Sequence, residues 1–412
     1  MKNVKKLLAM LLAVAMVFSM AACGDSSAST SAADNAGSAA STENASNGTV
    51  IKLGGIGPLT GAAAIYGNAT KYGSEIAVEE INALGGVQFE IQWQDDEHDP
   101  EKSVNAYNTL KDWGMQMLVG TTTTAPCVAV TTESNTDRIF QLTPSASSTD
   151  VIGGQADADG NVTIARKDNV FQMCFTDPNQ GTASAQYIKD QNLGTKIAVI
   201  YNNSDAYSTG IYNKFAAEAE TLGLDIVSTT TFTDDTANDF TVQLGDAKKA
   251  GADLIFLPIY YTPASLIMTQ AKEMEYDVKL FGVDGMDGIL DLEGFDTTLA
   301  EGVMLLTPFT ADAEDEKTQA FVKKYKEKYN TTPNQFAADA YDCVYAIYEA
   351  VQKNGVTADM SAADICTKMI ETFSGDFTFN GITGTNVTWS DSGEVSKAPK
   401  GMVIQNGAYV GM

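Results

Sequence analysis

The sequence is poor in histidine and in positive charge. His98 is the only histidine among 412 residues, which leaves little material for a nucleophile–histidine pair or a histidine-based metal site. Lys and Arg number 26 against 53 Asp and Glu, a formal net charge of −27. Because nucleic acids and anionic lipids bind basic patches, this balance opposes both as partners. We therefore expect no catalytic residue, no metal, no cofactor and no nucleic acid.

The nucleotide-binding signatures are also missing. "VIKLGGIGPLTG" from Val50 looks like a strand that enters a glycine-rich turn. A dinucleotide motif counted from Gly55 requires glycine at position 60, where Thr60 stands, and Pro58 removes a backbone N–H that a pyrophosphate needs. No G-x-x-x-x-G-K-[ST] occurs anywhere. The sequence therefore disfavours a nucleotide enzyme.

Cysteine is scarce and is not spaced for redox or zinc chemistry. The last four of the five cysteines are Cys127, Cys174, Cys343 and Cys366, with no C-x-x-C pair among them. All four lie in apolar segments, which predicts buried free thiols. A Cys343–Cys366 bridge remains open at this point.

The N-terminal residues predict export. Lys2, Lys5 and Lys6 precede an apolar run from Leu7 to Ala22, which is shorter than the ~20 residues of a membrane span and indicates a signal peptide over 1–22. The following Met20-Ala21-Ala22-Cys23-Gly24 resembles the bacterial lipobox, which implies a lipid on Cys23; an ordinary secretory signal is the alternative. Residues 23–48 carry no large apolar side chain, which predicts a disordered linker. We expect an extracytoplasmic, lipid-anchored protein of a bacterial cell membrane.

From Val50 onward, apolar strand-like runs alternate with amphipathic helical patterns. The strand-like runs are "VIKLGGIG", "VQFEIQW", "MQMLVG", "IFQLTP", "KIAVIYN", "LDIVSTTTF", "ADLIFLPIY", "VKLFGV" and "GVMLLTPF". Such alternation predicts an α/β protein with doubly wound parallel sheets covered on both faces. The first helix should end at Gly85-Gly86 and bury one face, made of Ala69, Tyr72, Ile76, Ala77, Ile81 and Leu84.

There are too many strands for one small sheet, so we expect two lobes. The predicted boundaries are 49–175 with 307–395 for lobe 1, and 176–306 with 396–412 for lobe 2. The helix-rich stretch 314–373 returns to lobe 1, and a hairpin is expected around Asn406-Gly407. The polar insert 153–169 is predicted to be a loop. Its Asp157-x-Asp159-Gly160-Asn161 run lacks the closing Glu of a calcium loop, so a turn is favoured.

Polar residues follow several strands, where parallel sheets bind ligands. Residues 121–124 and 145–148 each place hydroxyls at or near an expected helix N-terminus, which favours an anion. Other strands end in Tyr207, in Tyr260-Tyr261 and in Asp284. This set suits a zwitterion, with its carboxylate on hydroxyls and N–H groups and its ammonium on Asp284. Asp287 is expected to be a solvated turn residue.

The acidic stretch "DDEHDPEKS" is better explained as a helix start than as a metal site. Asp99 is expected as the N-cap and Pro100 as the first helical residue, with Glu101 in the first turn.

Several segments together resemble a known family. They include "IKLGGIGPLTGAAAIYGNATKYG", "VGTTTTA", "YNNSDAYSTG" and "FGVDG", and are similar to the branched-chain-amino-acid-type binding proteins of ABC importers, which have the type I periplasmic-binding-protein fold. The resemblance runs from residue 50 to the end. It implies two lobes joined by a three-stranded hinge, which close on an amino acid and deliver it to permease and ATPase subunits in other chains. A sensing module for a signalling partner, a binder of a small amide or other amino-acid relative, and an enzyme with Asp284 as general base are the alternatives; the last is disfavoured because no nucleophile–base pair accompanies it.

The resemblance also implies which residues contact the ligand. They are Tyr66, Thr124, Ser145, Ser147, Tyr207, Tyr260, Tyr261, Asp284 and Phe336. The sequence departs from the family at three places. His98 and Thr123 stand where the family often has a disulfide, and Gln172 stands where it often has arginine. Asp284 replaces what is often a glutamate, which shortens the acidic arm by one methylene.

Overall fold

The computed structural model describes residues 50–157 and 159–412. The predicted signal peptide, the linker 23–48 and Cys23 lie outside the described residues. Within the described part, no helix combines the length and the apolar character that a membrane crossing requires.

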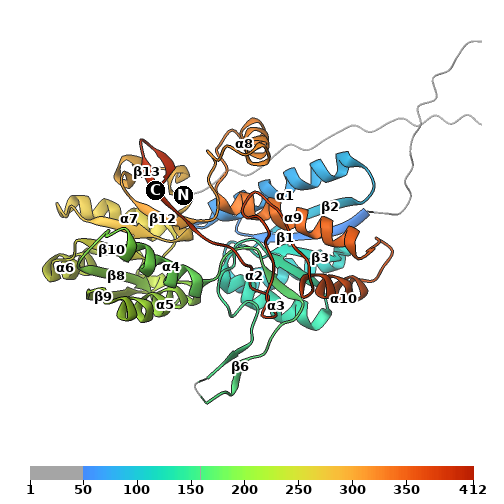
Figure 1. The fold of residues 1–412 in the computed structure, drawn as a ribbon, viewed down its shortest axis with the longest axis horizontal. Coiled ribbons are helices and arrows are strands. Elements are labelled where there is room, and N and C mark those ends of the chain that lie inside the picture. The colour runs from blue at the N-terminus through green and yellow to red at the C-terminus, as the bar shows by residue number, and fades with distance from the viewer. Residues whose placement is uncertain (1–49, 158) are drawn as a thin grey trace, which may run out of the picture. The chain divides into compact units, whose positions relative to one another are not determined.

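The first sheet has five parallel strands in the order β2-β1-β3-β4-β7. Their bounds are Val50–Gly57 (β1), Gln88–Asp95 (β2), Met117–Gly120 (β3), Phe140–Thr143 (β4) and Val170–Gln172 (β7). The helices that pack around this sheet are α1 (Ala64–Leu84), α2 (Pro100–Trp113), α3 (Thr124–Asp137), α9 (Gln335–Lys353) and α10 (Ala362–Phe373). Helix α9 packs along α1, although they are far apart in sequence (Figure 1).

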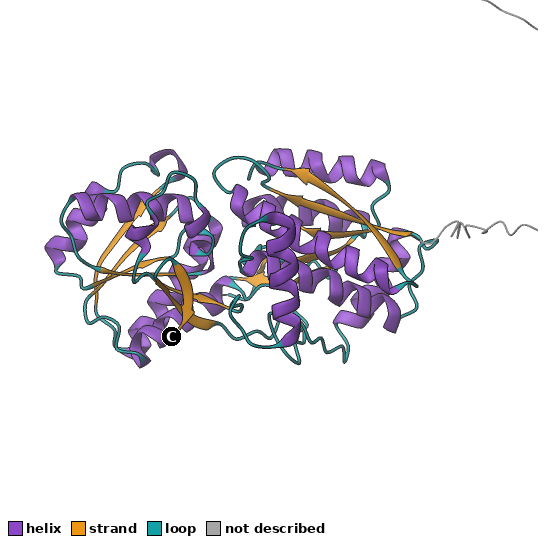
Figure 2. Ribbon diagram, turned by 90° about the horizontal axis from the view of Figure 1, so that it is seen from above, coloured by secondary structure: helices purple, strands orange, loops and turns teal. Residues whose placement is uncertain are grey.

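The second sheet has seven strands in the order β14-β13-β12-β11-β10-β8-β9. Its parallel strands are β8 (Ile197–Asn202), β9 (Ile226–Phe232), β10 (Leu254–Leu257), β11 (Lys279–Gly282) and β12 (Met304–Thr307). The antiparallel edge consists of β13 (Lys400–Gln405) and β14 (Ala408–Gly411). They form the predicted hairpin, with Asn406 and Gly407 at positive φ in its turn. Helices α4 (Asp177–Asp190), α5 (Ala206–Leu222), α6 (Thr241–Ala250) and α7 (Tyr261–Glu273) accompany this sheet (Figure 1). Figure 2 shows strands with helices around them in both halves of the described chain.

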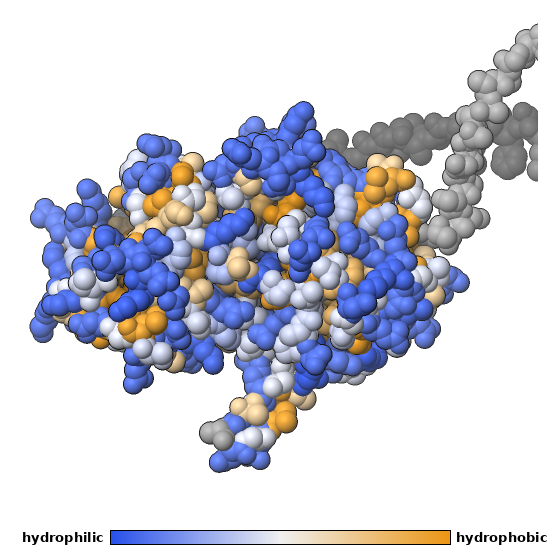
Figure 3. Space-filling model, in the orientation of Figure 1, coloured by the Kyte–Doolittle hydropathy of each residue, from blue (hydrophilic) through white to orange (hydrophobic). Residues whose placement is uncertain are grey.

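The chain passes between the two sheets three times, after β7, after β12 and before β13. The second passage leads into α8 (Glu316–Tyr329), which contacts α1. All nine predicted strands are present, and the predicted fold class is confirmed. On the face drawn in Figure 3, hydrophilic residues dominate the surface.

Local signals act largely as predicted. The Asp99 carboxylate accepts the N–H of Lys102 at 2.9 Å as N-cap of α2, with Pro100 at the first helical position. Helix α1 ends before Gly85 at φ +75, but Leu84 is 67% exposed, so its assignment to the buried face is wrong. Leu84 is the last residue of the helix, and its side chain is left in solvent there.

The insert and the cysteines can now be described. The insert is not only loop, because β5 (Gln155–Ala156) pairs with β6 (Val162–Ile164) as a separate two-stranded sheet. Between them, the Asp157 carboxylate accepts backbone N–H groups of Asp159 and Asn161, as in the favoured turn. Four cysteines lie within the described residues, and all four are buried free thiols, so Cys343 and Cys366 are not bridged.

Candidate ligand-binding site

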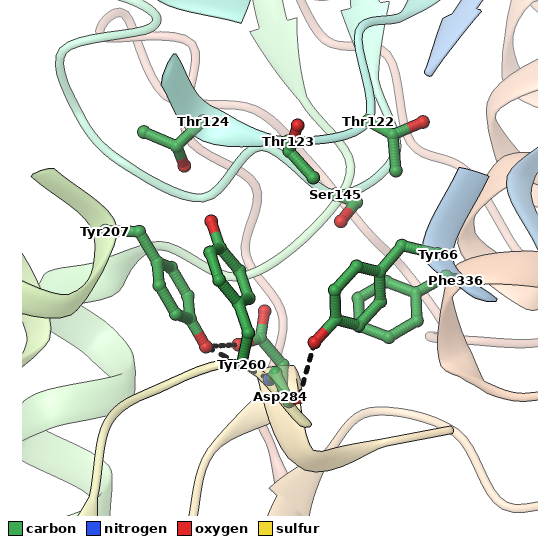
Figure 4. Close-up of a pocket in the computed structure, with 10 residues that line it drawn as sticks. Tyr66, Thr122, Thr123, Thr124, Ser145, Tyr207, Tyr260, Asp284 and Phe336 are labelled. Atoms are coloured by element: carbon green, nitrogen blue, oxygen red, sulfur yellow. Dashed lines mark hydrogen bonds between the residues drawn. The ribbon is translucent and has the colours of Figure 1, made fainter. Parts of the chain in front are cut away.

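A cavity lies where loops after the first sheet face loops after the second (Figure 4). It contains about 240 Å³ of space not filled by protein atoms. Its lining residues are Tyr66, Thr122, Thr123, Thr124, Ser145, Tyr207, Tyr260, Asp284, Gly285 and Phe336. That space includes open solvent, and its enclosed part has room for about one water molecule.

The first sheet contributes neutral donors. Thr124 is the first residue of α3, and its N-cap Thr123 makes no side-chain cap. Within the described residues, the N–H groups of Thr124 and Ala125 and the hydroxyls of Thr124 and Ser145 have no hydrogen-bond partner. Because a helix N-terminus carries partial positive charge, this corner can hold a carboxylate.

The second predicted anion cradle is not built as expected. No helix follows β4, because residues 144–154 are bends and turns. Helix α4 begins only at Asp177, whose N–H donates to the Ser147 carbonyl at 3.0 Å. Ser145 therefore reaches the cavity from a loop. The loop is held by Gln172, which donates to the carbonyls of Ala146 and Ser148 at 2.8 and 3.0 Å.

The second sheet contributes a carboxyl group. Asp284 follows β11 and is 3% exposed. The Tyr207 hydroxyl donates to Asp284 Oδ1 at 2.6 Å and accepts the Gly285 N–H at 3.0 Å. Burial raises the pKa of Asp284 to about 7, although the Tyr207 hydroxyl opposes this shift. A cation at this carboxyl would restore its charge.

Aromatic rings form the side walls (Figure 4). Tyr207 stacks on Tyr260 with ring centroids 4.7 Å apart, and Tyr66 meets Phe336 at 4.8 Å. Tyr66, on α1, donates to the Gly285 carbonyl at 2.6 Å and accepts the Tyr261 N–H at 3.1 Å. These hydrogen bonds therefore join the two sides of the cavity.

Two predicted site residues do not line the cavity. Tyr261 is buried, and its hydroxyl accepts the Ile65 N–H at 3.2 Å, so it joins the two sides beside the cavity. Ser147 is 1% exposed, and its hydroxyl has no partner within the described residues. The other seven predicted residues surround the cavity, and their roles toward a ligand stay predictions.

Three lining residues are absent from the ligand contacts that the family resemblance implies. Thr122 and Thr123 belong to the same threonine run as Thr124, so the run itself was the available signal. Gly285 follows Asp284 directly. The hydroxyls of Thr122 and Thr123 are already paired, with Thr70 Oγ1 at 2.9 Å and His98 Nδ1 at 2.8 Å.

The expectation for Asp287 was wrong. It is 4% exposed, and its carboxylate accepts the Gln335 N–H at 2.9 Å at the start of α9. Burial raises its pKa to about 6. The "VDGMDG" stretch looks like an exposed turn because sequence alone does not show that α9 covers it.

A further buried carboxyl, that of Asp177, lies near enough to Asp284 for their charges to interact. Asp177 is 1% exposed, and neither carboxylate oxygen has a partner among the described residues. Burial raises its pKa well above the usual value. Gln180, one turn along α4, accepts the Asp284 N–H at 3.2 Å and leaves its amide nitrogen without a partner. The acidic side of the cavity therefore also contains buried polar atoms that have no hydrogen-bond partner within the described residues.

Comparison with known proteins identifies the family. The family model described as "Periplasmic binding protein" matches residues 50–406. The chain is 27% identical to "Leu/Ile/Val-binding protein homolog 3" of Brucella melitensis, over 80% of this chain and 87% of that protein. It is 26% identical to the "Leucine-, isoleucine-, valine-, threonine-, and alanine-binding protein" of Pseudomonas aeruginosa, over 74% of this chain and 79% of that one.

A solved structure gives the same result. The branched-chain amino acid transporter substrate binding protein of Streptococcus pneumoniae, in complex with isoleucine, superimposes with a TM-score of 0.74 at 26% identity, covering 87% of this chain and 97% of that chain. With a family model that spans most of its length, the chain belongs to the periplasmic binding proteins, as an extracytoplasmic solute-binding protein of the type I fold and not an enzyme.

Proposed function

We propose that this protein is a lipid-anchored binding protein that captures an amino acid in the cavity and delivers it to the permease of an ABC importer. One observation carries the proposal: free hydroxyls and N–H groups at the start of α3 face a buried carboxyl at Asp284. Such opposite poles complement an α-carboxylate and an α-ammonium, while aromatic rings receive the side chain. The names of the relatives, which refer to Leu, Ile and Val, support the same ligand class.

A thermal-shift screen over the amino acids tests the binding step. A ligand at ~100 times its Kd adds roughly 2.7 kcal/mol to the free energy of unfolding. We expect a clear rise in Tm with at least one amino acid and none with the matching amine or carboxylic acid that lacks the second pole. If an acid without the amino group raises Tm as much as the amino acid, the zwitterion assignment is wrong.

The proposal also includes closure. Lobe 1 (49–175 with 307–395) and lobe 2 (176–306 with 396–412) close on the ligand as a hinged pair. Small-angle scattering should show a smaller radius of gyration at saturating ligand. An unchanged radius would contradict closure without contradicting binding.

Anchoring is proposed at Cys23. The variant Cys23→Ala should move from the membrane fraction to the soluble fraction, with Cys127→Ala as the matched control. A Cys23→Ala variant that stays in the membrane pellet like the wild type would remove the anchor from the proposal.

A further inference from the structure

The loop between β2 and α2 fixes the only histidine beside the cavity. The N–H of His98 donates to Asp96 Oδ1 at 2.9 Å, and Asp96 is fully buried. His98 itself has φ +64, a left-handed conformation that residues other than glycine adopt uncommonly. A tight turn, held by the buried Asp96, therefore determines where its imidazole lies.

That imidazole touches two walls of the cavity. Its Nδ1 lies 2.8 Å from the hydroxyl of Thr123, after the first sheet. Its ring meets the Tyr260 ring edge to face, with centroids 5.6 Å apart and an interplanar angle of 85°. Tyr260 follows the second sheet, so one side chain contacts lining residues from both sheets. Figure 4 shows the Thr123 hydroxyl turned away from Tyr260, which leaves the methyl group of Thr123 on the cavity side.

We propose that His98 is a positioning residue of the ligand site, whose neutral imidazole fixes Thr123 and Tyr260 in the closed arrangement and thereby couples ligand affinity to pH. The inference rests on the proposed function, because it concerns the same cavity. His98 stands outside the lining set, so it acts through Thr123 and Tyr260 and not by touching the ligand.

The surroundings of His98 favour its neutral form. Burial lowers its pKa, and this outweighs the two carboxylates that raise it: Asp234, in the short helix η1 (Asp234–Thr236) after β9, and Asp99, the N-cap of α2. Tyr260 and Thr123 face the ring as uncharged groups. Protonated Nδ1 can still donate to Thr123, so the cost of protonation is the burial of a charge. Since closure buries the ring, affinity should fall as acid protonates His98 in the open form.

The single histidine makes a direct measurement simple. In the full chain labelled with ¹⁵N-histidine, the NMR spectrum contains one imidazole, whose pKa is read with and without the amino acid that gave the largest thermal shift. We expect the ligand to lower this pKa. A pKa that the ligand leaves unchanged contradicts this inference alone, whereas no binding by any amino acid contradicts the proposed function together with it.

Variants separate positioning from simple packing. His98→Asn keeps a hydrogen-bonding group near the place of Nδ1 but does not titrate, and His98→Ala removes both contacts. At pH 8 we expect His98→Asn to bind within about threefold of wild type and His98→Ala about tenfold more weakly. Between pH 7 and pH 5, wild type should lose about fivefold more affinity than His98→Asn. Equal pH profiles for the two proteins, or equal affinities of His98→Ala and wild type, overturn the inference.

Discussion

The loops after the first sheet and those after the second differ in how they meet a ligand. The first set offers Thr124, Ser145 and helix N–H groups, all neutral and ready to donate. The second offers Asp284, a carboxyl that is 3% exposed and already bonded to Tyr207. A neutral pole needs no partner to remain stable when the cavity is empty, but a buried charge does. Burial raises the pKa of Asp284, so that its carboxyl group is partly neutral in the empty cavity and becomes charged when the ligand binds.

Removing the charged pole should have the largest effect. Asp284→Asn keeps the shape and the bond to Tyr207 but cannot pair with an ammonium, and we expect a loss of affinity of thirtyfold or more by calorimetry, because breaking a desolvated pair costs ~2–5 kcal/mol. Asp246→Asn, an exposed position on α6, is the matched control. Binding by Asp284→Asn within a few-fold of wild type would place the ammonium elsewhere.

Removing a neutral donor should cost less. Thr124→Val deletes one hydroxyl at constant shape, and a hydrogen bond to a charged group contributes ~1.5–3 kcal/mol, so we expect a loss of affinity of about tenfold or somewhat more. Thr132→Val, on the exposed side of α3, should bind like wild type. A larger loss of affinity in Thr124→Val than in Asp284→Asn would contradict the assignment of the ligand's carboxylate to Thr124 and of its ammonium to Asp284.

The same comparison predicts proton release. Asp284, with a pKa raised to about 7, is partly protonated in the empty site at neutral pH and is ionised when it pairs with an ammonium. Affinity should therefore be full above pH 8 and fall by about tenfold by pH 6. Calorimetry at pH 7 in buffers of different ionisation enthalpy should show a proton leaving on binding, in the His98→Asn background to isolate Asp284. Proton uptake would give the opposite sign and exclude an ionised Asp284 in the complex.

Removing the hydrogen bonds that join the two sides of the cavity should have the smallest effect on ligand affinity. Tyr66→Phe removes the hydrogen bonds to the Gly285 carbonyl and from the Tyr261 N–H but keeps the ring. We expect a loss of affinity of about threefold to tenfold with ligand selectivity unchanged. Tyr325→Phe is the control, because Tyr325 is also a buried tyrosine but lies outside the residues that line the cavity. Changed selectivity in Tyr66→Phe would mean that its hydroxyl reads the ligand directly.

The strands and the cavity residues that follow them closely could be predicted because both are local in sequence, whereas Tyr66 and Phe336 were expected only from the family resemblance. Asp284 follows an apolar strand, and ligands bind at strand ends, so its place was readable. The predictions for Leu84 and Asp287 were wrong because the burial of both depends on tertiary packing: Leu84 is left exposed at the end of α1, and Asp287 is covered by α9, some fifty residues away in the chain. Asp177 was missed because its burial depends on how α4 packs on α5.

The position of α9 and α10 also bears on how the chain is made. Their side chains Cys343, Ile347 and Phe373 belong to the same core as strands β1 and β4. A ribosome has finished the five parallel strands of the second sheet before it reaches them. One face of the first sheet therefore stays uncovered until α9 and α10 have been synthesised. Contacts between segments so far apart in the chain form slowly. A fragment that ends after β12 should remain unfolded, expose apolar surface and aggregate. Truncation near the C-terminus should therefore disrupt folding more than a point mutation near the N-terminus.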